Sequence, residues 1–572
     1  MRAVQAAFPR HAAAWLLIAA ILIIVGVALA IWTQTRGGTV TDVRFRGADG
    51  TVFSALLYRP PGATAAHPAP GILAVHGYIN SRETQSPFAI EFLRRGYVVL
   101  ALDQRGHGYS GGGATAKGFG GPEALAYFRK LPFVDPRNIG LEGHSMGGWA
   151  VLAAAAVMPG DYTAMVLEGS SVGAPFARNG TPVWPRNVAV VFSRFDEFAP
   201  LMWGVPRAAD VGTSAKLRAM FGTTSNVVTD RLYGSIADGT ARLLRTPVAT
   251  HPGDHLSTVA VAVAADWFGR TLIGGHTRAA DDQIWWIKEA GTGLALIGLA
   301  ALVFGTFDFL LGLTPFVPRA IAARAASASA GSATTLWLLT AFIPAVTYYC
   351  ALLVLPPPIV VSAIFPQAIT NWLMVWAVGN AAVALGLGRL VRRAQAADVV
   401  PMPPILPAIA VAVTVMAVAY GVVSATALWN VDFRFWVVAV KPLSRSQLLS
   451  FCVYLAPFTL FIAVTFRSLG RILPPDRGSV GRYLSAMGAL SLGFLTLTAG
   501  QYAILFATGA LPLPFEALNV ILAIQFVPLL AGLACLAVYS ERRTSSFLPG
   551  AFIGGLFVTW YVVAGTATQF TP

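Results

Sequence analysis

Charged residues are scarce in this chain of 572 residues, of which they make up only 12%. Soluble domains carry roughly twice that share, about 25%. Hydrophobic residues make up 56% of the chain. A protein with so few charges cannot present a polar surface everywhere, so we expect part of it to lie in lipid.

Cysteine is also nearly absent. The three that occur, Cys350, Cys452 and Cys535, all lie in apolar runs. They form neither a disulfide framework nor a zinc-binding spacing. The sequence also lacks a phosphate-binding loop and a dinucleotide fingerprint. We therefore expect no metal and no cofactor.

The net charge of +14 raises the question of nucleic-acid binding, and the distribution of charge argues against it. Residues 37–280 hold 22 basic and 17 acidic side chains, and the remainder holds 18 and 9. Basic residues between apolar spans are typical of membrane topology, and no basic–aromatic groove motif occurs. We therefore expect a lipid bilayer, and no nucleic acid, as a partner.

Apolar runs long enough to cross a bilayer, roughly 20 residues each, are unevenly placed. One lies near 13–32, and the next begins only after Lys288. Eight follow, near 292–313, 335–355, 369–388, 405–428, 447–466, 483–507, 517–538 and 549–568. This pattern predicts an amino-terminal segment at 1–36, a soluble domain at 37–280 and a membrane domain at 281–572.

The short loops between these spans predict the orientation in the membrane. With the amino terminus in the cytoplasm, nine spans place thirteen arginines inside and only three basic residues outside. The thirteen are Arg2, Arg10, Arg319, Arg324, Arg389, Arg392, Arg393, Arg467, Arg471, Arg477, Arg482, Arg542 and Arg543, and the three are Arg434, Lys441 and Arg445. This bias predicts a multi-pass protein of the cell (inner) membrane whose soluble domain is periplasmic or extracellular.

The first span has two interpretations. Ala28-Leu29-Ala30 resembles a signal-peptide cleavage site, so the span is either an anchor or a signal peptide. Both interpretations export the soluble domain.

The soluble domain alternates between strand-like and helix-like segments. Short apolar runs suited to strands buried on both faces lie at 71–77, 97–103, 138–145, 164–170 and 188–194, with helix-length segments between them. Such alternation predicts a doubly wound, mostly parallel α/β sheet. The segment before it predicts an antiparallel hairpin that turns at Asp49-Gly50.

The pentapeptide Gly143-His144-Ser145-Met146-Gly147 lies where one of these strands gives way to a helix. A serine on such a tight turn needs small residues on both sides, and Gly143 and Gly147 meet that need. Ligands of open α/β sheets bind beyond the carboxyl ends of the strands, where Ser145 lies. Ser145 is therefore a candidate nucleophile, and an ordinary turn serine is the alternative.

Four motifs follow one another along the chain, and their order is informative. They are "HGY" at 76–78, "DQRGHGYS" at 103–110, "GHSMGG" at 143–148, and the late pair "FDEFAP" and "PGDH". On these motifs, residues from about 40 to 272 resemble the α/β-hydrolase family, particularly its bacterial serine esterases and dienelactone-hydrolase-like members. The resemblance covers less than half of the chain. The membrane domain resembles no family that we can name.

The resemblance implies a triad in the chain order serine, acid, histidine. That order removes Asp103, His107 and His144, which all precede Ser145. Asp196 is the expected acid, with Glu197 as the runner-up and Asp210 as a distant third. His255 is the expected base, because it directly precedes a helix at a place where a catalytic loop belongs. His251 is the alternative, with a surface loop histidine as its plainer interpretation.

The family's oxyanion hole maps onto the backbone N–H groups of Tyr78 and Met146. We interpret His76 as a buried, hydrogen-bonded scaffold residue. For Asp103 and Arg105 an internal ion pair is the expected role.

Two features stay open at this stage. The segment 200–235 is longer than the fold requires, and it either caps the pocket or packs on the membrane domain. Asp308 lies within an apolar span, where a carboxylate is costly and often functional.

These observations predict an integral membrane serine hydrolase that acts on acyl esters, with lipid-derived esters as the favoured class. The sequence leaves the oligomeric state open. Three alternatives remain: a serine peptidase, an acyltransferase with the same triad, and a transporter or scaffold whose hydrolase-like domain only binds. A peptidase is expected to keep paired acids for a free amino terminus, and no clear pair is seen. A scaffold is expected to have a degraded triad.

Overall fold

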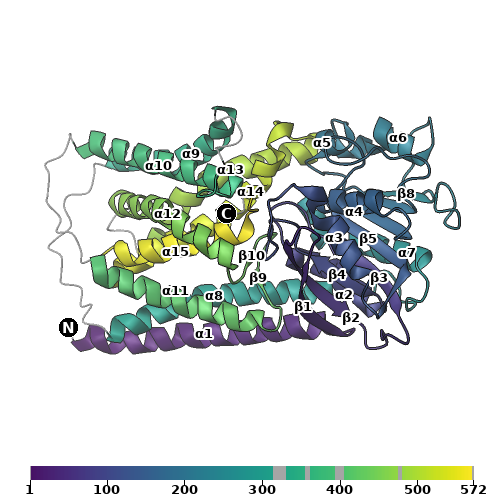
Figure 1. Cartoon of the computed structure of the whole chain (residues 1–572). Coiled ribbons are helices and arrows are strands. Elements are labelled where there is room, and N and C mark those ends of the chain that lie inside the picture. The colour runs from purple at the N-terminus through teal and green to yellow at the C-terminus, as the bar shows by residue number, and fades with distance from the viewer. Residues whose placement is uncertain (1, 314–329, 355–360, 393–404, 474–478, 570–572) are drawn as a thin grey trace.

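The structure, a computed structural model, describes residues 2–313, 330–354, 361–392, 405–473 and 479–569. Figure 1 shows a sheet flanked by helices at one end of the molecule and a bundle of long helices at the other. Arg319, Arg324, Arg393 and Arg477, which enter the count of basic loop residues, lie outside the described residues.

One eight-stranded sheet forms the framework of the first part, in the order β1-β2-β4-β3-β5-β6-β7-β8. Its strands are β1 (Thr39–Arg46), β2 (Val52–Arg59), β3 (Ala69–Val75), β4 (Val98–Leu102), β5 (Val134–His144), β6 (Ala164–Glu168), β7 (Val188–Val191) and β8 (Arg242–Arg245). Strands β3 to β8 run parallel, while β1 and β2 form an antiparallel hairpin. The mostly parallel sheet predicted from the sequence is confirmed.

Helices cover both faces of this sheet. Helices α2 (Ser86–Arg94) and α7 (Thr258–Thr271) bury Phe92 and Trp267 against one face. Helices α3 (Gly121–Phe128) and α4 (Met146–Val157) bury Leu125 and Val151 against the other. Strands β3, β4, β6 and β7, and β5 from Ile139 onward, are buried on both faces, which explains their apolar sequences.

The long segment between β7 and β8 packs on the hydrolase-like core. It forms α5 (Ala199–Trp203), the 3-10 helix η3 (Ala208–Thr213) and α6 (Ala215–Phe221). Trp203, Leu217 and Met220 are buried in the same apolar cluster as α3 and α4. The segment therefore extends this core. Its first helix, α5, lies beside the helical bundle (Figure 1).

A helix lies at each of the nine predicted spans. They are α1 (Arg2–Gln34), α8 (Trp285–Leu313), α9 (Ala330–Val354), α10 (Ala368–Arg392), α11 (Ile405–Ala427), α12 (Arg445–Ile472), α13 (Ser479–Thr508), α14 (Ala517–Thr544) and α15 (Leu548–Gly565). Among the described residues, eight helices are long and apolar enough to cross a membrane, and α9 is a shorter apolar helix over Ala333–Tyr349.

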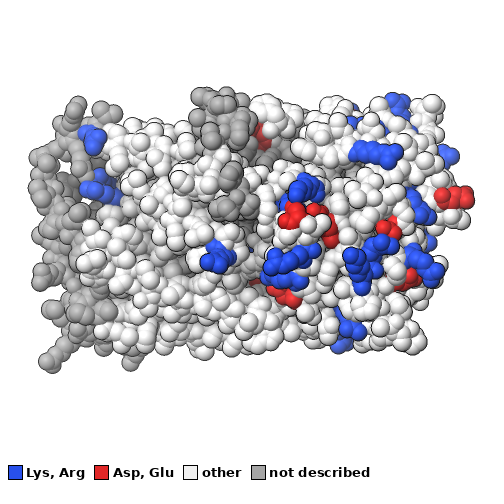
Figure 2. All heavy atoms as spheres, in the orientation of Figure 1, with Lys and Arg blue, Asp and Glu red and all other residues white. Residues whose placement is uncertain are grey.

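The surface agrees with a membrane protein. On the face shown in Figure 2, charged side chains gather over the sheet-containing part. The helical part is almost free of charge until its far end, where basic side chains reappear. Large apolar side chains such as Leu17, Ile24 and Leu406 are more than half exposed in the bundle, as expected for residues that face lipid.

Helix α1 packs tightly along α8. A Cβ atom at Gly26 would lie 2.4 Å from the Gly291 carbonyl oxygen, and one at Gly298 would lie 2.7 Å from Ile23 Cγ1. Gly305, one further heptad along α8, is equally close to Leu16. Small residues on one side let two membrane helices approach closely. The first span is therefore an integral part of the bundle in this structure.

Asp308 ties three helices together. Its Oδ2 accepts hydrogen bonds from Tyr539 Oη at 2.6 Å and Arg543 Nη2 at 2.8 Å, both on α14. Trp15 on α1 donates to the same tyrosine oxygen at 3.1 Å. Both hydrogen bonds of Asp308 involve Oδ2, while the buried Oδ1 has no hydrogen-bond partner among the described residues. The contacts at Oδ2 link α8 to α14 and, through Tyr539, to α1.

Candidate active site

Ser145 lies on a strained turn between β5 and α4. Its φ of +54° and ψ of −121° are unusual for a residue with a side chain. The Ser145 N–H donates to the Glu168 carbonyl at 2.7 Å. A Cβ atom at Gly143 would lie 2.4 Å from the Gly147 backbone, and one at Gly147 would lie 2.0 Å from the Val75 carbonyl oxygen. The turn thus requires both glycines, as the sequence predicted.

The loop after β3 lies against this turn. A Cβ atom at Gly77 would lie 3.1 Å from Ser145 Cβ, so Gly77 packs against the candidate nucleophile. Tyr78 is the next residue in the chain. Met146 is the first residue of α4. Within the described part of the chain, the amide of neither Tyr78 nor Met146 donates to a protein acceptor. Both N–H groups are therefore available to an oxyanion.

Asp196 and His251 are joined by a side-chain hydrogen bond. His251 Nδ1–H donates to Asp196 Oδ2 at 2.8 Å, and Asp196 Oδ1 accepts the Phe198 N–H at 2.8 Å. Both side chains of the pair are buried. Burial alone lowers the pKa of His251, but the Asp196 carboxylate outweighs it and raises that pKa above its ordinary value.

The structure does not bring His255 to Asp196, which corrects the assignment from the sequence. His255 Nε2 lies 3.4 Å from Asn80 Nδ2. Burial lowers the pKa of His255 to about 3, so its ring is neutral. The interpretation of His251 as a surface loop residue is also wrong, because only 5% of its surface is exposed.

A short bridge between chain segments explains this outcome. Phe195 pairs with Thr250 in parallel, so the next residue on each side, Asp196 and His251, lie next to one another. The 3-10 helix η4 (Pro252–Leu256) then carries His255 away, toward the ring of Phe88. This pairing lies outside the named strands, so no local sequence pattern predicted it.

His144 links the acid–base loop to the nucleophile turn. It immediately precedes Ser145, and its Nε2–H donates to the His251 carbonyl at 2.9 Å. Its ring centroid lies 4.7 Å from that of His251 and 4.0 Å from that of His255. Burial, followed by the two neighbouring histidines, lowers the pKa of His144 well below its ordinary value. A neutral His144 therefore fixes the position of His251 relative to Ser145.

The two other acids considered from the sequence have different roles. Glu197 Oε2 accepts the backbone N–H of His251 at 2.7 Å and does not contact its ring nitrogen. Burial, followed by the Asp196 charge, raises the pKa of Glu197 to about 7. Asp210 forms a partly exposed ion pair with Arg207 at 2.7 Å. Asp196 is thus the acid that orients the ring of His251.

Helices and loops of the membrane part lie against the same edge of the sheet. Tyr502 on α13 donates to Glu197 Oε1 at 2.6 Å. Gln569, after α15, donates to the Tyr78 hydroxyl at 3.1 Å. Thr568 exchanges backbone hydrogen bonds with the loop after β4, accepting from Ala114 and donating to Gly106. The carboxyl ends of the strands therefore face the helical bundle.

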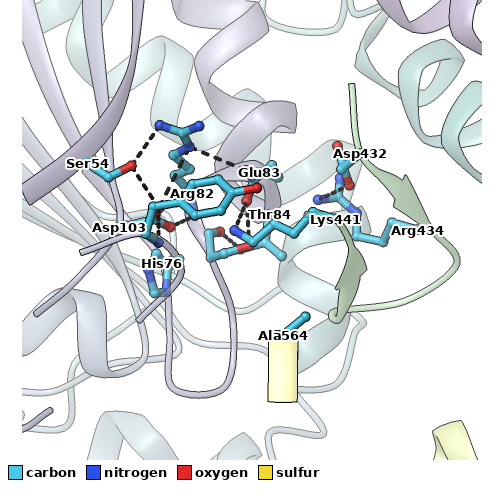
Figure 3. Close-up of polar contacts among 12 residues, drawn as sticks. Ser54, His76, Arg82, Glu83, Thr84, Asp103, Asp432, Arg434, Lys441 and Ala564 are labelled. Carbon is cyan, nitrogen blue, oxygen red and sulfur yellow. Dashed lines mark hydrogen bonds and ion pairs between the residues drawn. The ribbon is translucent and has the colours of Figure 1, made fainter. Parts of the chain in front are cut away.

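The loop after β3, residues 76–81, carries Tyr78 and is called the oxyanion loop below, after the role proposed for that residue. A buried network of charges lies beside it (Figure 3). The 3-10 helix η1 (Arg82–Gln85) follows that loop, and Glu83 Oε2 accepts from Lys441 Nζ at 2.9 Å. Lys441 follows a two-stranded hairpin between α11 and α12, made of β9 (Phe433–Arg434) and β10 (Ala439–Val440). In the same hairpin region Asp432 accepts from Lys288 at 3.2 Å. This network ties the oxyanion loop to the membrane part.

His76 has the scaffold role predicted for it. Its Nδ1–H donates to the Gly77 carbonyl at 2.7 Å, and its Nε2 accepts the Gln104 N–H at 3.0 Å. Burial lowers the pKa of His76 to about 4, which keeps this pattern of one donor and one acceptor.

Asp103 and Arg105 are internal, as expected, but they do not pair with one another. Asp103 accepts from the Arg82 N–H at 2.8 Å and from Ser54 Oγ at 3.0 Å. Arg105 pairs with Asp49 and Glu123, at 2.9 Å and 3.0 Å. Both residues lie beyond the end of β4 at Leu102, and each has its own separate partners there.

No group of three or more metal-binding side chains occurs in the described ranges. The expectation of an enzyme without metal or cofactor stays a prediction.

Comparisons with known proteins agree with the fold. A family model described as serine aminopeptidase, S33, matches residues 66–203. A monoacylglycerol lipase of Mycolicibacterium smegmatis is 38% identical over 111 residues, which are 18% of this chain and 38% of the lipase. The quorum-quenching protein AidA of Acinetobacter baumannii is 35% identical over 122 residues, 20% of this chain and 39% of that protein.

The chain thus spans about two fifths of the length of these curated relatives. Among solved structures, an esterase of Pyrococcus furiosus is similar at 16% identity and a TM-score of 0.31, over 41% of this chain and 91% of that one. That likeness decides nothing by itself. The sheet order, the turn at Ser145, the family model and the two curated relatives agree: the chain carries an α/β-hydrolase domain joined to helices long and apolar enough to cross a membrane.

Proposed function

We propose that this protein is a membrane-bound serine hydrolase of acyl esters, with Ser145 as the nucleophile, His251 as the base and Asp196 as the orienting acid. The observation that carries the proposal is the 2.8 Å bond between His251 and Asp196, beside the strained turn that holds Ser145. An intact acid–base pair at that place argues against a domain that only binds.

The proposed reaction has two stages. His251 Nε2 takes the proton of Ser145 as Oγ attacks the ester carbonyl carbon, and the amides of Tyr78 and Met146 stabilise the oxyanion. The protonated His251 then gives its proton to the departing alkoxide, which leaves an acyl-enzyme. Water, deprotonated by His251, releases the acid and restores Ser145. Asp196 stabilises the charged imidazole throughout.

A lipid-derived ester is the substrate that the setting favours. The carboxyl edge of the sheet lies against α13 and the segment after α15, and a site beside apolar helices favours a substrate that partitions into the bilayer. The similarity to a protein described as a monoacylglycerol lipase supports the same class. The arginine bias of the short loops supports the proposal that this chemistry occurs on the non-cytoplasmic face.

Hydrolysis of a long-chain monoacylglycerol by the purified full chain in detergent micelles tests this function. Ser145→Ala is expected to abolish release of the fatty acid. Ser170→Ala is the control, because Ser170 is a nearby buried serine that packs against Gly148, in the first turn of α4, and has no part in the proposed triad. Its activity is expected to stay near that of the wild type.

Two further assays separate the remaining reaction types. Cleavage of an aminoacyl naphthylamide at a higher kcat/KM than the ester would move the assignment to a peptidase. Transfer of the acyl group to added glycerol faster than to water would move it to an acyltransferase. Inactivity of a folded wild type on all three substrates would contradict the enzymatic proposal.

A further inference from the structure

We propose that Tyr502, on membrane helix α13, is a positioning residue of the hydrolase site, acting on His251 through Glu197. The inference rests on the proposed function and adds to it that the membrane part takes part in catalysis by holding the base. No local feature of the sequence connects these residues, since Tyr502 and Glu197 are 305 positions apart.

The carboxylate of Glu197 lies between the two parts of the molecule. Its Oε1 accepts the Tyr502 hydroxyl at 2.6 Å, and its Oε2 accepts the His251 N–H at 2.7 Å. Only 2% of Glu197 is exposed, so water does not compete effectively for either oxygen. Hydrogen bonds to an ionised group are the stronger kind. Each oxygen of Glu197 therefore holds one partner, and the Glu197 side chain connects the Tyr502 hydroxyl to the backbone of His251.

The neighbouring aromatic rings hold the same segment from both sides. Phe195 meets Phe506 on α13 edge to face, with ring centroids 5.1 Å apart. Phe198 packs against the His251 ring at 4.6 Å. Phe195, Phe198 and Tyr502 all pack against an apolar cluster that includes Leu505. The segment that carries Asp196 and Glu197 is thus clamped between the catalytic ring and α13.

Electrostatics link Tyr502 to the proton affinity of the base. The titratable groups that face Glu197 are Asp196, His251, Asp254 and Tyr502. The Tyr502 hydrogen bond favours the ionised form of Glu197, whose negative charge in turn raises the pKa of His251. Without the hydroxyl, Glu197 stays protonated to higher pH. The pKa of His251 then falls, and the acidic limb of the rate profile moves to lower pH.

Four variants of the full chain test the inference: Tyr502→Phe, Glu197→Gln, the double variant, and Tyr454→Phe as the matched control. Like the partly buried Tyr502, the buried Tyr454 lies on a helix of the bundle and donates its hydroxyl to a side-chain oxygen, here Asn371 Oδ1 at 2.6 Å. The readouts are the rate of inactivation by a fluorophosphonate and the pH dependence of kcat/KM for p-nitrophenyl butyrate, between about pH 5 and pH 9.

Tyr502→Phe is expected to lower the rate at the plateau by roughly three- to tenfold, the effect of one hydrogen bond, and to move the acidic limb to lower pH. Glu197→Gln is expected to move the limb in the same direction. The double variant is expected to resemble the more impaired single variant, since both changes break one connection. Tyr454→Phe is expected to match the wild type in both readouts.

The results separate this inference from the proposed function. A wild type that does not react with the fluorophosphonate overturns the function. A wild type that reacts, with Tyr502→Phe equal to it in rate and limb, overturns the inference alone. A loss of rate in Tyr502→Phe with an unmoved limb also overturns it, because such a loss marks a general structural defect.

Discussion

Two histidines four positions apart have opposite surroundings in this site. His251 faces a carboxylate that raises its pKa, whereas burial lowers the pKa of His255 to about 3. A general base must take up a proton in the transition state, so the first environment suits the task and the second opposes it. The proposed mechanism therefore depends on His251.

Replacing each histidine in turn tests this assignment. His251→Ala is expected to lower kcat/KM on the order of ten-thousand-fold, the effect of removing a triad base. His255→Gln keeps a polar side chain of similar size beside Asn80 and is expected to stay within about tenfold of the wild type. The reverse order of the two losses would return the role to His255.

A second residue-scale prediction concerns the buried carboxyls of Glu142 and Glu168, at the ends of β5 and β6. Burial raises the pKa of Glu142 to about 8 and that of Glu168 well above its ordinary value. Because folding raises these pKa values, the folded state binds the protons more tightly and loses stability as the pH rises toward 8. Glu142→Gln removes one of the two groups and is expected to flatten this decline.

Thermal unfolding of the full chain in detergent, followed at about pH 6 and pH 9, measures this effect; roughly 1 kcal/mol corresponds to about 2–4 °C in a domain of this size. The expected result is a smaller difference between the two midpoints in Glu142→Gln than in the wild type. Gln85, which donates to both Glu142 oxygens at 2.7 Å and 2.8 Å, retains an acceptor in this variant. An equal or larger difference would contradict the account.

Single residues of the site were predictable to different degrees. The turn that carries Ser145 could be located because a strand-to-helix turn has a local signature in its glycines. The oxyanion roles of Tyr78 and Met146 came only from the family resemblance and stay predictions. The base could not, because the choice between His251 and His255 depends on the bridge between Phe195 and Thr250, residues 55 positions apart in the chain. Tyr502 and Gln569 gave no signal at all, since a hydroxyl or amide in an apolar span is common and its distant partner is invisible to local patterns.

At the scale of elements, the hairpin β9–β10 joins the oxyanion loop through the ion pair of Lys441 and Glu83. Their side chains are only 3% and 7% exposed. Removing one partner of such a buried pair leaves the other charge uncompensated. The pair is therefore a sensitive point of the joint between sheet and bundle.

Lys441→Met is accordingly expected to destabilise the protein by about 3–5 kcal/mol, with a lower thermal midpoint and a reduced rate of fluorophosphonate labelling. Adding Glu83→Gln to it is expected to restore part of the loss. Asp266→Asn is the control, since it breaks an exposed pair with Arg270 and should change stability by less than about 1 kcal/mol. Equal midpoints for Lys441→Met and the control would contradict a role in the joint.

The contact between α1 and α8 gives a second prediction at this scale. A side chain at Gly298 would collide with Ile23, so Gly298→Leu is expected to separate the two helices and lower the thermal midpoint. Gly312 lies on the same helix, no atom of the described residues lies within 4 Å of its Cβ position, and Gly312→Leu is expected to change little. Similar midpoints for the two variants would show that the glycine contact contributes nothing.

The elements themselves were largely predictable from sequence. Strands buried on both faces and membrane helices each need an unbroken apolar run, and the length of the run distinguishes them. Asp49-Gly50 predicted the hairpin of β1 and β2, and Gly50 has the positive φ, +81°, that such a turn requires. The 3-10 helices η1 and η4 and the hairpin β9–β10 were not foreseen, because they are short and are held by contacts between distant segments.

At the scale of the whole molecule, the site lies at the junction of the two parts. The carboxyl ends of the strands, which bear the nucleophile turn and the acid–base loop, contact α13 and the segment after α15. This arrangement gives the membrane helices a purpose beyond anchoring. In our account they deliver a lipid ester to Ser145 and hold the residues that activate it.

The measurement that tests this account most directly is labelling of intact cells with a charged, membrane-impermeant fluorophosphonate, followed by mass spectrometry of the labelled peptide. The account predicts an adduct on Ser145 in the wild type, none in Ser145→Ala, and a strongly reduced yield in His251→Ala. An adduct that forms only after permeabilisation would place the site on the cytoplasmic face. A folded wild type without any adduct on Ser145, even after permeabilisation, would contradict the catalytic account itself.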